Sequence, residues 1–144
     1  MPQRDIIHFA VRNALIKDGW TITADPYVFE FEAVRAYADL EAEPLLAAVN
    51  NGRRILVEIK AMVGPSAIHA YEEALGQYQF YRYLIHLTGT EHQVYLAVSE
   101  EAYHNILQRD GLREVVALSR MAILVINVRM EEVVQWIEPA TIEP

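Results

Sequence analysis

The chain has 144 residues, of which 53% are hydrophobic and 22% are charged, and its formal net charge at pH 7 is −8. This length suits one domain with its own core, and the balance of apolar and charged residues excludes wholesale disorder. The absence of cysteine excludes disulfides, thiolate metal sites and a cysteine nucleophile.

The first part of the chain predicts a helix followed by an antiparallel meander. Apolar residues recur at helical spacing over 4–17, and Gly19 supplies a stop signal. Asp25-Pro26 is a turn signal. After this turn, the pattern predicts a first strand at 27–32 and a second at 34–41.

A hairpin is predicted at the end of this meander. Apolar runs at 45–49 and 54–61 flank Asn50-Asn51-Gly52. Asn-Gly between apolar runs is a strong hairpin signal, because both central residues of a type I′ turn need positive φ. The two runs are therefore expected to pair antiparallel.

The second part of the chain alternates between helices and strands. The predicted elements are a helix at 67–87, a strand at 93–98, helices at 100–109 and 112–119, a strand at 121–128, and an apolar tail around Trp136. Ser99 is expected to cap the helix at 100–109. Together with the first part, this order predicts a single α/β (α+β) domain over 1–144, with a mixed sheet and flanking helices.

Two charged side chains share one face of the strand within 54–61. Alternate residues of a strand face opposite sides, so Leu56, Glu58 and Lys60 lie on one face and apolar residues line the other. Burying a carboxylate and an ammonium is costly unless solvent, mutual pairing or a ligand compensates. The simplest interpretation is a solvent-facing strand on which Glu58 and Lys60 are ordinary surface charges.

Further residues favour a catalytic site. Asp39 lies upstream on the neighbouring predicted strand, and Gln77 and Tyr81 project from one helix face at i and i+4. Phosphodiester hydrolysis suits this set, with Asp39 and Glu58 as oxygen ligands of Mg²⁺ or Mn²⁺. Lys60 would hold the attacking hydroxide and stabilise developing charge, while Gln77 and Tyr81 would orient the phosphate or Lys60.

The same residues carry a family resemblance. Asp39, Glu58-x-Lys60 and Gln77-x-x-x-Tyr81 are similar to the PD-(D/E)xK nucleases whose helix carries Q-x-x-x-Y. Six segments in order also resemble the XisH family of element-excision controlling factors: 12–23, 39–43, 57–60, 74–78, 95–98 and 133–137. The resemblance implies a restriction-endonuclease-like core. It also implies control of DNA-element excision by a site-specific recombinase, together with an XisI-type partner protein.

The chain departs from the family pattern at two positions. Glu41 replaces an expected glycine and adds a negative charge near Asp39. Phe9 stands where an acidic residue is usual, which leaves His8 as a weak candidate for a metal helper from the first helix. His92 has no metal-ligand spacing and is expected to have a structural or surface role.

The acidic charge bears on partners and location. Non-specific nucleic-acid binders usually carry a basic surface, so DNA contact here would need a local patch, a bound cation or a partner. Arg53, Arg54 and Arg82 are the best candidates for a patch. Charges interrupt every apolar run and no secretion leader is evident, so a cytoplasmic protein without a membrane span is expected.

The sequence leaves three hypotheses open. The first is a Mg²⁺-dependent DNA endonuclease using Asp39, Glu58 and Lys60. The second is a catalytically silent binding module with a nuclease fold, acting through an XisI-type partner and a recombinase. The third is a structural domain whose Glu58–Lys60 pair lies at a homodimer interface.

Overall fold

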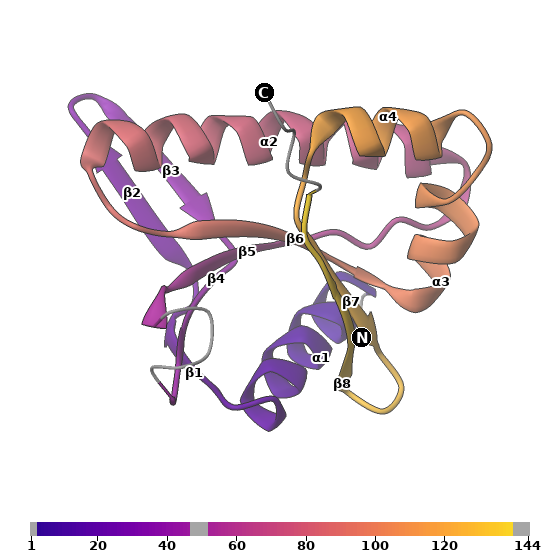
Figure 1. Cartoon of the computed structure of the whole chain (residues 1–144), viewed down its shortest axis with the longest axis horizontal. Coiled ribbons are helices and arrows are strands. Elements are labelled where there is room, and N and C mark those ends of the chain that lie inside the picture. Colours follow the sequence, from indigo (N-terminus) through magenta and orange to yellow (C-terminus); the bar gives the residue numbers. More distant parts are fainter. Residues whose placement is uncertain (1–2, 47–51, 140–144) are drawn as a thin grey trace.

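A computed structural model describes residues 3–46 and 52–139. Its centre is a six-stranded mixed sheet in the order β1-β4-β5-β6-β7-β8 (Figure 1). The strands are β1 (Trp20–Ala24), β4 (Leu40–Pro44), β5 (Ile55–Ile59), β6 (Gln93–Ser99), β7 (Ile123–Asn127) and β8 (Glu132–Ile137). The β5-β6-β7 core is parallel, and the pairs β1-β4, β4-β5 and β7-β8 are antiparallel.

Helices cover both faces of this sheet. The helices are α1 (Gln3–Lys17), α2 (Ala67–Thr88), α3 (Glu100–Ala102) and α4 (Leu112–Ser119), with a 3₁₀ turn η2 (Gly64–Ser66) and a π-helical turn η3 (Tyr103–Leu107). In Figure 1, α2 and α4 lie on one side of the sheet and α1 lies on the other. A separate hairpin of β2 (Tyr27–Phe31) and β3 (Val34–Ala38) packs beside α2.

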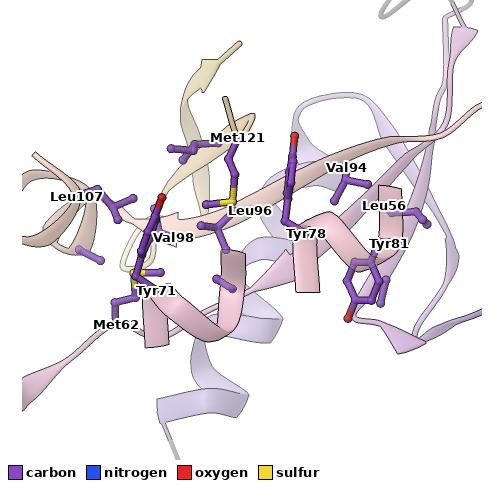
Figure 2. Packing of buried hydrophobic residues seen from close by; sticks show 14 of the residues in the cluster. Leu56, Met62, Tyr71, Tyr78, Tyr81, Val94, Leu96, Val98, Leu107 and Met121 are labelled. Carbon is purple, nitrogen blue, oxygen red and sulfur yellow. The ribbon is translucent and has the colours of Figure 1, made fainter. Parts of the chain in front are cut away.

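The alternation of side chains along each strand builds two cores. Ile55 and Val57 point toward α1 and join the cluster that contains Val11 and Leu15. Leu56, on the other face of β5, joins a second cluster with the tyrosines of α2. Figure 2 shows Tyr71, Tyr78 and Tyr81 extending from α2 among these strand residues. A strand buried on both faces, as β5 is, accounts for the nearly continuous apolar run in its sequence.

Most predicted elements are confirmed. The predicted helices at 4–17, 67–87 and 112–119 match α1, α2 and α4 within one residue, and the strands at 27–32 and 93–98 match β2 and β6 equally closely. The strand predicted at 121–128 is β7, shorter at both ends. Ser99 caps the helix that follows it, because its Oγ accepts a hydrogen bond from the N–H of Ala102 at 3.1 Å. The mixed α/β class is therefore confirmed.

The predicted meander is confirmed in its antiparallel pairs β2-β3 and β4-β5, but its continuity as one sheet is wrong. The strand predicted at 34–41 is interrupted at Asp39, since β3 pairs only with β2 while β4 enters the main sheet. β1 was not expected, and it now forms the sheet edge beside β4. The apolar tail is strand β8, which packs Trp136 against Trp20 with ring centroids 5.5 Å apart. These assignments depend on pairing between strands that are far apart in the sequence, and a local residue pattern does not reveal such pairing.

Two further predictions need correction or lie outside the described residues. β4 ends at Pro44, and residues 45 and 46, where the strand at 45–49 was predicted to begin, form a bend. The expected antiparallel pairing is confirmed between β4 and β5. Asn50 and Asn51 of the predicted turn lie outside the described residues. The helix predicted at 100–109 is α-helical only over α3 and continues as the π-helical turn η3. Within 3–46 and 52–139, no helix combines the length and hydropathy needed to cross a membrane.

Candidate functional site

Glu58 lies on the face of β5 that packs against α2. The face assignment made from the sequence is confirmed, because Leu56 and Glu58 point to α2 while Ile55 and Val57 point to α1. Glu58 is only 6% exposed, and the side chain of Lys60 is 13% exposed. The interpretation of both residues as ordinary surface charges is therefore wrong. A carboxylate and an ammonium at this depth require specific compensation.

Asp39 reaches the same site from the junction between β3 and β4. Its Oδ2 accepts a hydrogen bond of 2.7 Å from the backbone N–H of Ile59. The backbone N–H of Asp39 in turn donates to the Glu58 carboxylate. The sheet change at Asp39, which the sequence did not predict, thus fixes its carboxylate at the carboxyl end of β5.

Burial and a second carboxylate alter the acidity of Glu58. Removal from water raises its pKa to about 7 from 4.5, and the negative charge of Asp39 adds to this effect. The hydrogen bond with Tyr81 and the charge of Lys60 act in the opposite direction. Near neutral pH, Glu58 is therefore present in both its protonated and its ionised form, whereas an ordinary surface glutamate is almost fully ionised.

The hydroxyl of Tyr81 joins α2 to Glu58. Its oxygen lies 2.6 Å from the backbone oxygen of Tyr37 and 3.0 Å from Oε1 of Glu58. A hydroxyl carries one proton, so Tyr81 can donate it to the Tyr37 carbonyl or to the Glu58 carboxylate, which are both acceptors. Donation to Glu58 stabilises its carboxylate, which is why this bond lowers the pKa of Glu58. Burial, followed by the charge of Glu58, raises the pKa of Tyr81, which keeps the hydroxyl neutral.

Lys60 stands between two carboxylates. Its Nζ lies 3.9 Å from Oε2 of Glu58 and 2.5 Å from Oε1 of Glu73. The Glu73 side chain is 55% exposed and marks the solvent side of the site. Sequence analysis missed Glu73, although the spacing that selected Gln77 and Tyr81 extends one helical turn back to it.

Gln77 contributes an unsatisfied acceptor. Its side chain hydrogen-bonds to Tyr81, and this bond lowers the pKa of the tyrosine against the larger opposing effects. Its Oε1 is buried and is the only such side-chain oxygen or nitrogen without a partner in the described residues. A buried amide oxygen without a donor is costly, so this position suits a water or a cation.

The donor set can be compared with what a cation requires. No cluster of three or more His, Asp or Glu side chains arranged to hold a metal occurs within the described ranges. Asp39 and Glu58 together with the free oxygen of Gln77 offer hard oxygen atoms. This set fits Mg²⁺ or Mn²⁺, which bind through one or two carboxylates and keep several waters.

The two departures from the family pattern lie away from this set. His8 bonds to Asp25 at 2.9 Å and α1 covers the opposite face of the sheet, so His8 does not join the site. Glu41 is buried, accepting from Thr23 Oγ1 at 2.8 Å and meeting His92 Nε2 at 2.6 Å. The structural role expected for His92 is confirmed.

Comparison with known proteins identifies relatives over nearly the whole chain. The family model described as XisH protein matches residues 1–134. The crystal structure of an XisH family protein from Nostoc punctiforme PCC 73102 is 34% identical, with a TM-score of 0.82 over 93% of this chain and 100% of that chain. The structure of an fdxN element excision controlling factor protein from Anabaena variabilis is also 34% identical, with a TM-score of 0.83 over 94% of this chain and 100% of that chain. No curated protein matches the chain.

Proposed function

The chain belongs to the XisH family, and from this premise we propose that it is a metal-dependent DNA phosphodiester hydrolase that helps to control the excision of a DNA element. The convergence of Asp39, Glu58 and Lys60 at the end of β5 carries the proposal. The excision-control role follows the name of the Anabaena variabilis relative, an fdxN element excision controlling factor. The hydrolytic role follows the PD-(D/E)xK pattern of the same three residues.

The carboxylates and the amide oxygen would hold the cation. When bound to Asp39 and Glu58, Mg²⁺ or Mn²⁺ supplies activation of water and neutralises charge on the phosphate. The hydrogen bond from Ile59 N–H orients the Asp39 carboxylate. Tyr81 bonds to Glu58 and Gln77 bonds to Tyr81, and this chain of hydrogen bonds would orient the Glu58 carboxylate toward a cation.

Lys60 would stabilise the reacting phosphate. It is mostly buried, where a positive charge acts more strongly on developing negative charge than it does in water. Glu73 balances this charge in the protein alone, and its half-exposed position allows a phosphate oxygen to take its place beside Lys60. Lys60 is thus paired with Glu73 in the protein alone, and a phosphate group of the substrate would displace Glu73 from it.

A DNA cleavage assay with a matched lysine control tests the proposal. The chain has two lysines, Lys17 and Lys60. Lys17 bonds to the Met130 carbonyl on the exposed surface, so Lys17→Ala removes the same charge away from the site. We expect cleavage of supercoiled, linear or branched DNA with Mg²⁺ or Mn²⁺, retained in Lys17→Ala and lost in Lys60→Ala. Absence of cleavage, or equal cleavage by the two variants, refutes the hydrolytic role.

A catalytically silent binding module is the second candidate. Large apolar side chains lie exposed along the outer side of α2: Phe80 is 44% exposed, Tyr83 62% and Leu87 54%. Their i, i+3, i+7 spacing suits contact with another protein, either an XisI-type partner that connects to the recombinase or a second copy in a homodimer. A pull-down with an XisI-type protein tests this function. Binding that is lost in Tyr83→Lys and retained in Lys60→Ala favours the binding module.

A further inference from the structure

A second polar concavity lies at the edge of the sheet where the parallel strands begin. It has a volume of about 310 Å³ and is lined by Arg53, Arg82, Arg120, Tyr78 and His92, among others. Arg53 precedes the start of β5 by two residues, and Arg120 precedes the start of β7 by three. Because β5, β6 and β7 are parallel, their first residues share one edge, and α2 brings Arg82 over it.

This pocket concentrates positive charge on an acidic protein. It holds three of the ten arginines of a chain whose net charge is −8. No ion pair in 3–46 or 52–139 involves Arg82 or Arg120. Like charges gathered around one concavity repel each other unless an anion lies between them.

Two carboxylates that act on residues of this pocket are engaged by other groups. Glu138 accepts from the side-chain amide of Gln93 at 2.8 Å and from the hydroxyl of Tyr95 at 2.5 Å. Glu41 is bound by His92 and Thr23. These two carboxylates therefore have polar partners of their own, and Arg82 and Arg120 remain the arginines of the pocket for which the described residues show no ion pair.

The walls of the pocket are held in place. The Tyr78 hydroxyl accepts a hydrogen bond of 3.0 Å from the buried N–H of Ala122, and the Arg82 guanidinium lies 6.0 Å from the centre of the Tyr78 ring. A guanidinium beside an aromatic ring keeps its planar fork of donors available. Arg120 ends α4 in the left-handed conformation (φ 57°), a position that glycine or asparagine usually occupies.

We propose that this pocket binds a phosphodiester group of a nucleic-acid backbone, separately from the site at Asp39, Glu58 and Lys60. The inference rests on the proposed function in assuming that the protein meets nucleic acid. Guanidinium forks match phosphate oxygens in geometry and charge. Arg53 precedes Glu58 by five residues, which an extended chain spans in about 16 Å. One DNA strand covers that length in about five nucleotides, at 3.4 Å each.

The ordinary explanation is that these arginines are solvated surface charges. The chain supplies a matched control for this alternative, because Arg35 and Arg113 are 61% and 56% exposed and lie elsewhere on the surface. Replacing either pair with glutamine removes the same two charges. A general effect of net charge on DNA binding therefore weakens both double variants equally.

Binding in the presence of a chelator tests the pocket without cleavage. The probe is a fluorescently labelled 20-base-pair duplex, followed by anisotropy over a range of salt concentrations with EDTA. The plot of log K against log salt has a negative slope, and each lost phosphate contact makes this slope shallower by about 0.9. We expect the double variant Arg82→Gln, Arg120→Gln to have a slope that is shallower by about 1.8. We also expect its binding at low salt to be at least tenfold weaker. The Arg35→Gln, Arg113→Gln pair is expected to bind as the natural chain does.

Further variants and competitors sharpen the result. Arg82→Lys with Arg120→Lys keeps the charge and loses the fork, so the salt slope should persist while affinity falls. Equal weakening by both glutamine pairs, or no duplex binding by the natural chain, overturns the proposal. Displacement of the duplex by inorganic phosphate at equal phosphate concentration would assign the pocket to free phosphate and would overturn it as well. Binding is measured in EDTA, where metal-dependent cleavage does not occur, so failure of cleavage and failure of the pocket are distinguished.

Discussion

Replacing Glu58 with glutamine should change how stability depends on pH. The pKa of Glu58 is raised to about 7 in the folded protein, from 4.5. Between these values the folded state holds a proton that the unfolded state has released. The contribution of Glu58 to stability is therefore fully present below pH 4.5 and is lost as pH rises through 7. Glu58→Gln keeps the neutral form at every pH and should escape this loss.

The size of the effect follows from the pKa difference. Each pKa unit corresponds to about 1.4 kcal/mol, so the natural chain should lose about 3 kcal/mol relative to Glu58→Gln between pH 4.5 and 8. For a domain of this length, unfolding entropy converts that loss to roughly 10 °C in melting temperature. The difference between the two proteins isolates Glu58, because their other titrating groups are the same.

Thermal melts of both proteins from pH 5 to 8 in EDTA provide the measurement. The melting temperature of the natural chain should fall relative to the variant as pH rises. A constant difference across this range would refute the protonation of Glu58 argued from its burial and from the nearby charge of Asp39. Adding Mg²⁺ at pH 8 should then stabilise the natural chain and leave Glu58→Gln unchanged, since only the former keeps both carboxylates.

Two more variants test the partners around these carboxylates. Glu73→Gln removes the exposed partner of Lys60, so stability should change by less than about 1 kcal/mol. DNA cleavage should accelerate in this variant, and a loss of cleavage would instead make Glu73 part of the machinery. His92→Ala leaves the buried Glu41 carboxylate short of a donor and should cost about 3 kcal/mol in urea unfolding at pH 7. Adding Glu41→Gln should recover part of that cost, and a cost below about 0.5 kcal/mol would contradict the buried network.

The sequence by itself determined the local features. Period-2 alternation placed Glu58 and Lys60 on one face of β5, and helical spacing placed Gln77 and Tyr81 on one face of α2. The bounds of α1, α2 and α4 also followed from local apolar spacing, with Gly19 and Gly89 beyond the ends of α1 and α2. These features depend on neighbours within a few residues, so local patterns carry them.

Only the tertiary structure decided which distant segments meet. It interrupted the predicted strand at Asp39, buried Glu58 among residues of β3, β5 and α2, and gave Lys60 the partner Glu73. It also paired Glu41 with His92 and gathered Arg53, Arg82 and Arg120 around one pocket. The physical reason is that strand pairing and the burial of charge depend on residues far apart in the chain. No window of neighbouring residues contains that information.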